Sequence, residues 1–208
     1  MAATFDGSDP SSPSFYKPSE TALLLLDFQN LTVQLCGDDG KAGLANAKTL
    51  RNWALAKGIL VLHSIIDAKT APRSTAKNPK TMDTILSMAK DDLDAANEPQ
   101  ETAADPANGD REVVVFKQLG FVSGLKSKGA MDVLKGRGIK SVVVCGLATS
   151  GAVLGTALAA ADEEFVVTVV EDACADRVEG LHDVLLRDVL GKHAHVCSVG
   201  ELVGRYGH

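Results

Sequence analysis

Two charged side chains and one polar turn follow apolar runs of this sequence, and their types suit proton transfer and the binding of anions. Asp27 ends the run "ALLLLD", and Lys117 follows "EVVVF". The turn "GLATSGA" follows "SVVVC", and a helical pattern begins at its last residue, Ala152. A carboxylate transfers a proton, an ammonium holds an anion, and the N–H groups of a helix start stabilise negative charge. Taken singly, each residue is more often a turn former, a helix cap or a solvated charge.

Alternating strands and helices are predicted to bring these residues together. Six short apolar runs are predicted strands: 22–27, 59–66, 112–116, 141–145, 165–170 and 194–199. Four segments have apolar residues at three- and four-residue spacing and are predicted helices: 43–58, 127–138, 152–163 and 178–191. This order predicts an α/β fold of three layers, a six-stranded parallel doubly wound sheet with helices on both faces. Ligands of such sheets bind at the carboxyl ends of the strands, where all three chemical groups fall.

The length of the chain suits one domain, predicted over residues 21–208, after a flexible lead-in of residues 1–20 that is rich in Ser and Pro. Residues 90–110 are acidic, rich in Ala and without strong periodicity. A long connection of this kind is usually a lid, a partner surface or a disordered insert. The sequence leaves these three alternatives open.

Composition excludes several classes of function. The net charge is −6, aromatic residues make up 4% of the chain, and no basic block is present, so a nucleic-acid partner is not expected. No apolar run approaches the roughly 20 residues of a membrane span, and no export signal precedes the domain. We therefore expect a cytoplasmic protein with four reduced, structural cysteines, at positions 36, 145, 174 and 197.

Four motifs in order resemble those of the isochorismatase-like cysteine hydrolases, a family that includes nicotinamidases and small-amide and ureide hydrolases. They are the apolar strand ending in Asp and followed by "FQN", then "GDREVVVFKQLGF", "VVVCGLATSGAVLGTALAA" and "VVEDACAD". The resemblance extends from about residue 21 to residue 203. Its last two motifs are the most specific.

The resemblance implies a catalytic triad of Asp27, Lys117 and a cysteine, but the cysteine position is Ala152 in this chain. It also implies an oxyanion hole formed by the N–H groups of Ala148 and Ala152, and a cis peptide between Leu147 and Ala148. The residues expected around the substrate are Phe28, Gln29, Phe121, Leu147, Thr149, Ser150 and Gly151.

The physical chemistry of the triad shows what the alanine removes. A thiol at a helix start is favoured as thiolate by the helix dipole and nearby N–H groups. Asp27 would accept its proton, Lys117 would hold the carboxylate, and the thiolate would attack a carbonyl carbon. Ala152 closes this covalent route. Cys145 lies seven residues earlier, inside the predicted strand, and is not expected to replace the missing thiol.

No metal or other cofactor is predicted. Metal-dependent relatives have an Asp with closely spaced histidines after the second strand, but "HSIIDAKTAPRSTAKNPK" has one Asp and no further His. No GxGxxG sequence opens a helix after the first strand, which makes a nicotinamide cofactor unexpected. His63 is interpreted as a hydrogen-bonded core residue. Arg73 and Lys77 are either surface charges or contacts for a polar or anionic substrate.

Three functions remain open at this stage. In the preferred one, the chain is an amide or ureide hydrolase whose nucleophile is replaced by Ala152, so that a small carbonyl substrate binds with little turnover. In the second, Asp27 acts as an acid on the vinyl ether of isochorismate, with water as the nucleophile. In the third, the chain is a non-catalytic binding protein. A homo-oligomer, dimer or tetramer, is expected from the resemblance.

Overall fold

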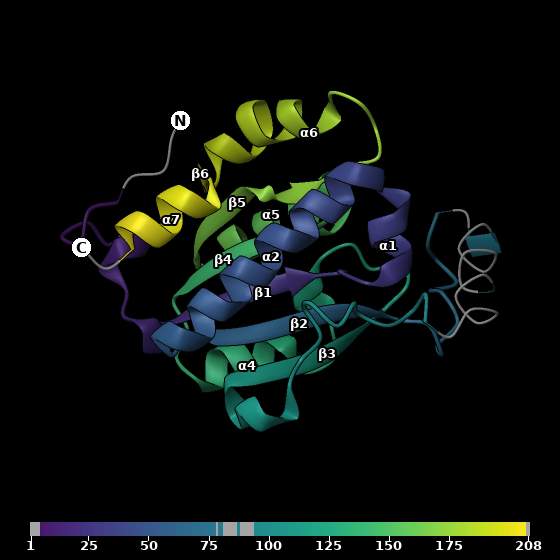
Figure 1. The fold of residues 1–208 in the computed structure, drawn as a ribbon, viewed down its shortest axis with the longest axis horizontal. Helices are drawn as coiled ribbons and strands as arrows, with labels where there is room; N and C mark the ends of the chain where they lie inside the picture. The colour runs from purple at the N-terminus through teal and green to yellow at the C-terminus, as the bar shows by residue number, and fades with distance from the viewer. Residues whose placement is uncertain (1–4, 78, 81–86, 88–93, 207–208) are drawn as a thin grey trace.

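Six strands form one entirely parallel sheet in the order β3-β2-β1-β4-β5-β6 (Figure 1). The computed structural model describes residues 5–77, 79–80, 87 and 94–206. The strands are β1 Thr21–Leu26, β2 Leu60–Asp67, β3 Glu112–Gln118, β4 Ser141–Leu147, β5 Val166–Ala175 and β6 His195–Cys197. The predicted α/β architecture is confirmed.

The middle of the sheet is buried because its strands are apolar on both faces. Every residue of β1 and of β4 is buried. On one face lies α2 (Gly37–Lys57), whose buried positions recur at three- and four-residue intervals: Gly40, Gly43, Ala47, Leu50 and Ala54. The helix ends at Gly58, which has the positive φ of 74° common after helix C-termini.

Helices cover the other face of the sheet as well. Adjacent residues of β2 point to opposite faces: His63 contacts Arg51 of α2 through Glu112, whereas Ser64 hydrogen-bonds Ser127, just before α4 (Ala130–Gly136). Helix α5 (Leu154–Asp162) contacts β4, β5 and the 3-10 turn η4 (Gly124–Lys126) that precedes α4. The sheet is therefore the middle of three layers.

Several elements differ from their predicted form. Strand β5 is longer than predicted, and the helices α1 (Asn30–Leu35) and α7 (Val199–Arg205) lie outside the predicted helices. The helix predicted at 152–163 begins earlier, with the π-helical turn η5 (Thr149–Val153). The one predicted at 178–191 is divided into α6 (Leu181–Val184), a π-helical turn at Leu185–Val189 and a 3-10 turn at Leu190–Lys192.

The described part of the predicted lead-in packs beside the C-terminal end of the chain. It contains two 3-10 turns, Pro13–Phe15 and Pro18–Glu20. The Ser11 carbonyl lies 2.7 Å from Nε2 of His195, and the Tyr206 hydroxyl donates to the Tyr16 carbonyl at 3.3 Å. These contacts bring the described part of the lead-in and the region of β6 and α7 to one side of the molecule (Figure 1).

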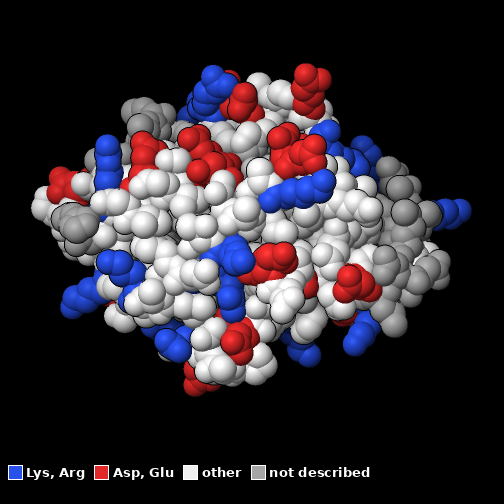
Figure 2. Space-filling model, viewed as in Figure 1, with Lys and Arg blue, Asp and Glu red and all other residues white. Residues whose placement is uncertain are grey.

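Residues 94–110 of the predicted insert contact the start of α1, the middle of β2 and the start of β3, and the 3-10 segment Pro106–Arg111 leads into β3. Residues 90–93 lie outside the described residues. On the face shown in Figure 2, acidic and basic side chains are interspersed rather than gathered by sign. Within the described ranges, no helix has both the length and the hydropathy needed to cross a membrane.

Candidate active site

A buried ion pair lies at the carboxyl edge of the sheet. Lys117, near the end of β3, donates from Nζ to Oδ2 of Asp27 at 2.6 Å and to the carbonyl of Val122 at 3.2 Å. Asp27 is 4% exposed and Lys117 is 2% exposed. The predicted contact between these two side chains is present, although 90 residues separate them in the sequence.

The backbone turns sharply at Asp27 as the chain leaves β1. Asp27 has a positive φ of 54°, a conformation that Asp tolerates better than most residues. Its N–H donates to the Ser64 carbonyl of β2 at 2.8 Å, and its own carbonyl accepts a hydrogen bond from the Thr32 hydroxyl of α1. These bonds fix the direction of the carboxylate.

Burial governs the electrostatics of Asp27. Desolvation raises the pKa of its carboxyl above the usual range, and the charge and hydrogen bond of Lys117 oppose that rise without cancelling it. Oδ1 is buried and has no hydrogen-bond partner in the described part of the protein. A buried carboxylate oxygen without a partner is suited to exchange a proton with a bound molecule.

The turn after β4 lies next to this pair. The Leu26 Cα pairs with that of Gly146, so Asp27 and the turn that begins at Ala148 leave adjacent strands at the same level. The expected cis peptide between Leu147 and Ala148 is present. Ala152 belongs to η5 and is 5% exposed. The structure thus places the three predicted positions at one edge of the sheet.

Two residues from the segment after β5 hold this turn, and sequence analysis assigned neither of them a role. Oδ2 of Asp176 accepts the Ser150 N–H at 2.7 Å, and Nδ1 of His182 lies 2.8 Å from the Thr149 hydroxyl. Burial disfavours the Asp176 charge, but hydrogen bonds from Ser150, Val178 and Arg177 outweigh burial and lower the pKa of the carboxyl. Asp176 ends the motif "VVEDACAD", which was the one signal for it.

The sequence model of the isochorismatase domain matches residues 21–201. The chain belongs to the isochorismatase family. No curated protein matches the sequence.

Solved structures of isochorismatase-like proteins share this fold at low identity. An isochorismatase family protein from Burkholderia thailandensis has a TM-score of 0.75 and 19% identity, over 91% of this chain and 97% of that one. A cysteine hydrolase from Pseudomonas syringae pv. phaseolicola 1448A has a TM-score of 0.70 and 19% identity, over 92% of this chain and 94% of that one. N-carbamoylsarcosine amidase from Thermoplasma acidophilum has a TM-score of 0.67 and 20% identity, over 86% of this chain and 96% of that one.

The residues expected around a substrate of this isochorismatase-family chain differ in accessibility. Phe28 and Thr149 are fully buried, and Leu147 is almost so. Gln29 is 4% exposed, and its amide bonds the backbone of Ile66 and Ala96. The remaining three expected residues are at least partly accessible: Phe121, Ser150 and Gly151.

Arg73 lies over the ring of Phe121, with its guanidinium carbon 4.5 Å from the ring centroid. Its Nε is buried and has no hydrogen-bond partner among the described residues. Lys77, the other basic residue considered in this loop, is exposed. Phe121 is adjacent in sequence to Val122, whose carbonyl accepts from Lys117, so Arg73 packs on the neighbour of a residue that contacts the ion pair.

The cysteines of the isochorismatase-family chain are all free in the structure. Cys145 is fully buried within β4, with Sγ 3.9 Å from the Leu24 carbonyl, and burial raises the pKa of its thiol well above the usual range. It therefore lies inside the sheet, as expected. In the described ranges, no group of three His, Cys, Asp or Glu side chains is arranged to hold a metal ion.

Proposed function

We propose that this isochorismatase-family chain binds a small carbonyl compound beside Asp27 and Lys117, in the site of an amide or ureide hydrolase whose nucleophile is absent. The observation that carries the proposal is the buried Asp27–Lys117 ion pair beside the turn that contains Ala152. An ion pair this well buried costs desolvation energy on both sides. Its position at the ligand-binding edge of a parallel sheet supports a chemical role rather than a structural one.

Each residue of the proposed site has a defined task. The N–H groups of Ala148 and Ala152 stabilise negative charge on the carbonyl oxygen of the ligand. Asp27 would accept the proton of a thiol if position 152 carried one, and Lys117 keeps the carboxylate oriented. Ala152 supplies no thiol, so the covalent step does not occur. Loss of the nucleophile in a comparable hydrolase lowers turnover by about 10⁶-fold.

Arg73 supports a polar or anionic group on the ligand. Its guanidinium is fixed against Phe121 and retains a buried N–H without a partner in the described part of the chain. Guanidinium groups pair preferentially with planar carboxylates. We infer that the ligand has such a group.

A second candidate function is hydrolysis of a vinyl ether such as isochorismate, and the raised pKa of Asp27 favours it. This reaction requires an acid that protonates the double bond and a water that attacks the resulting cation. A carboxyl whose pKa is raised by burial retains its proton closer to neutral pH. The unpartnered Oδ1 is the atom suited to donate it.

Restoring the thiol tests the proposal directly. We expect Ala152→Cys to gain hydrolysis of a small amide or ureide, which the unaltered chain turns over negligibly. Ala152→Cys combined with Asp27→Asn is the matched control, because it keeps the thiol but removes the base, and it is expected to be inactive. A screen of amides, ureides and isochorismate with all three proteins gives the readout.

The outcomes separate the functions. Release of pyruvate from isochorismate by the unaltered chain establishes the second candidate. An Ala152→Cys protein that folds but hydrolyses none of the amides or ureides contradicts the proposal. If calorimetry nevertheless shows that a carbonyl compound binds both proteins, the chain is a non-catalytic binding protein.

A further inference from the structure

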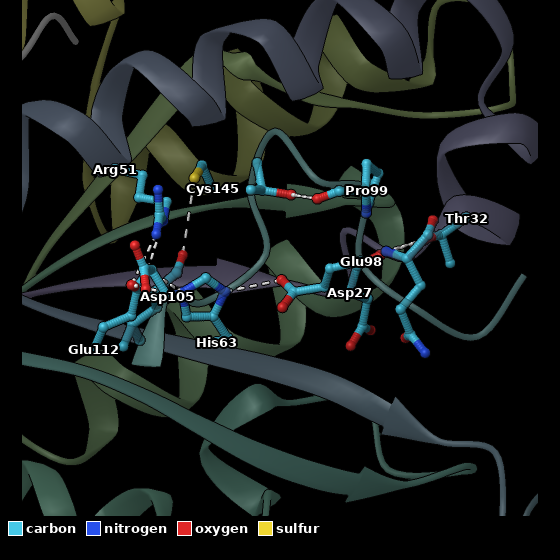
Figure 3. A network of polar contacts seen from close by, with 12 residues as sticks. Asp27, Thr32, Arg51, His63, Glu98, Pro99, Asp105, Glu112 and Cys145 are labelled. Carbon is cyan, nitrogen blue, oxygen red and sulfur yellow. Dashed lines mark hydrogen bonds and ion pairs between the residues drawn. The ribbon is translucent and has the colours of Figure 1, made fainter. Parts of the chain in front are cut away.

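A histidine lies between two carboxylates in the interior, on the face of the sheet away from the Asp27–Lys117 pair. His63 of β2 is fully buried; its Nδ1 lies 2.9 Å from Oε1 of Glu98, and its Nε2 lies 2.8 Å from Oε1 of Glu112 (Figure 3). Both carboxylates are themselves nearly or fully buried. A neutral imidazole has one N–H, so it can donate to only one of them. With both carboxylates ionised, both contacts are hydrogen bonds only when the ring is protonated.

The two carboxylates differ in what else holds them. Glu112 accepts from Arg51 Nε at 2.5 Å and Nη2 at 2.8 Å, from the Asn108 amide at 2.7 Å and from the Asp105 N–H at 2.9 Å. Among the described residues, His63 is the one hydrogen-bond partner of the Glu98 carboxylate. Loss of the ring proton therefore leaves Glu112 with its other donors, whereas Glu98 loses the positive charge that faces it and, in the neutral tautomer protonated at Nε2, its hydrogen bond as well.

Glu98 directly follows three residues whose carbonyls hold the start of helix α1. The carbonyls of Ala95 and Asn97 accept the N–H groups of Leu31 at 3.0 Å and Asn30 at 2.9 Å. The carbonyl of Ala96 accepts from the Gln29 side chain at 2.7 Å. The first N–H groups of a helix have no acceptor within the helix, so this segment supplies it. Helix α1 begins three residues after Asp27.

Few other titratable groups among the described residues face the ring. From α2 comes Arg51, which pairs with Glu112. From the turn before β3, the Asp105 carboxylate accepts the N–H of Ala107 instead. In the adjacent strand β1, the residue paired with His63 is Leu25, and the next residue across the sheet is Cys145, whose thiol pKa is raised well above the usual range by burial.

We propose that protonated His63 is a latch that holds Glu98, and with it residues 95–98, against the start of helix α1 beside Asp27. Loss of the ring proton releases Glu98 and uncaps the helix. The residues that take part are Gln29, just before α1, Asn30 and Leu31 on α1, and Ala95, Ala96, Asn97 and Glu98 on the segment. The latch does not depend on which reaction the site performs.

The direction of the pH response follows from the surroundings of the ring. Burial disfavours its charge, but the hydrogen bonds and charges of Glu112 and Glu98 outweigh burial and raise the pKa of His63 above its usual value of about 6.5. The latch is therefore fully closed below that usual value. It opens as the pH rises through the raised pKa.

Hydrogen exchange of the Asn30 and Leu31 amides reads the latch directly, because those N–H groups donate to the segment. Between about pH 6 and about pH 9.5 we expect their protection, corrected for intrinsic exchange, to fall roughly tenfold or more. The fall should follow the His63 ring titration, seen by NMR and assigned with His63→Gln. Protection of the Val143 amide in β4 should stay constant and serves as the reference for global unfolding.

Two substitutions of one segment provide a matched pair. Glu98→Gln removes the charge that faces His63, and we expect Asn30 and Leu31 to be weakly protected at both pH values. Glu101 is exposed and lies three residues after Glu98. Glu101→Gln removes the same charge there and is expected to behave like the unaltered protein. Three results would overturn the proposal. They are protection of the Asn30 and Leu31 amides that does not change with the His63 titration, a parallel fall in protection at Val143, and equal protection in the two variants.

Discussion

At the scale of the residue, the Asp27–Lys117 contact illustrates how burial changes the free energy lost when one partner of an ion pair is removed. Both side chains are almost inaccessible, at 6% and 3% exposure, so neither charge is solvated if the other is removed. The Lys135–Glu163 pair has a similar separation of 2.8 Å, but its side chains are 63% and 45% exposed. Water compensates for a lost partner there. The same chemical contact thus has different consequences at the two places.

Replacing Lys117 by Met should therefore destabilise the protein by about 3–5 kcal/mol near neutral pH, because it leaves a buried carboxylate unpaired. The penalty should shrink as the pH falls. Without the ammonium, nothing offsets the desolvation that raises the pKa of Asp27, and the protonated carboxyl is cheaper to bury. Urea unfolding at about pH 8 and about pH 5 measures both effects. Lys135→Met is the control with a much smaller loss, and equal losses in the two variants would refute the argument.

At the scale of the element, the close approach of β1 and β4 positions the site. Gly146 is opposite Leu26, the last residue before Asp27. A Cβ atom at position 146 would lie 2.4 Å from the Leu26 carbonyl oxygen and 2.5 Å from its Cβ. Glycine is therefore required where the two strands deliver Asp27 and the Ala152 turn to the same edge.

We expect Gly146→Ala to destabilise the protein by about 1–3 kcal/mol, because the two strands must separate at their carboxyl ends. Gly204 provides the matched control, since it lies within α7 and a Cβ there meets nothing within 4 Å. Gly204→Ala should stabilise the helix by about 0.5–1 kcal/mol. Urea unfolding of both variants measures these changes in the free energy of unfolding. A Gly146→Ala variant as stable as the unaltered protein would show that the strands adjust without loss of stability.

Elements whose burial repeats along the sequence were predictable. All six strands and the positions of Asp27 and Lys117 followed from apolar runs and the polar residues at their ends. The interpretation of His63 as a hydrogen-bonded core residue is confirmed, but its partners were not predicted. Glu98 lies in an acidic segment without periodicity, and that segment binds α1 through backbone carbonyls, which any sequence possesses. Its structure depends on tertiary contacts rather than on local pattern.

The same reasoning explains two errors at helix and strand ends. Strand β5 continues through Glu171 and Asp172, two charged residues that interrupt the apolar run on which the prediction was based. Oδ1 of Asp172 accepts the Val199 N–H at the start of α7 and so is used inside the fold. Helix α7 is short: its Ser198–Glu201 capping box starts a helix of only seven residues. Such a helix depends on packing, which a single-sequence pattern does not show.

At the scale of the whole molecule, buried charges tie four regions of the chain together. One connected network joins Arg51 of α2, His63 of β2, Glu98 of the segment before β3 and Glu112 of β3 (Figure 3). Burial disfavours the charge on Glu112, but the hydrogen bonds from His63, Arg51, Asn108 and Asp105 outweigh it and hold the pKa of the carboxyl well below its usual range. The network thus responds to acid through a carboxylate and to alkali through the imidazolium.

The free energy of unfolding should consequently be highest between about pH 4.5 and about pH 6.5, as far as this network determines it. The Glu112 contribution is complete above the pKa of the unfolded carboxyl and is lost as the pH falls towards the depressed value in the folded chain. Asp27, whose folded pKa is raised, moderates that loss, because the folded protein binds its proton more readily. The His63 contribution is complete below the pKa of the unfolded imidazole and is lost as the pH rises through the raised pKa of the folded protein.

Urea unfolding across this range should show that His63→Gln lowers the maximum free energy of unfolding and flattens the alkaline side of the curve, whereas Glu112→Gln flattens the acid side. His193→Gln, at an exposed position, should reproduce the unaltered curve; an alkaline slope that persists in His63→Gln would assign the response to other groups.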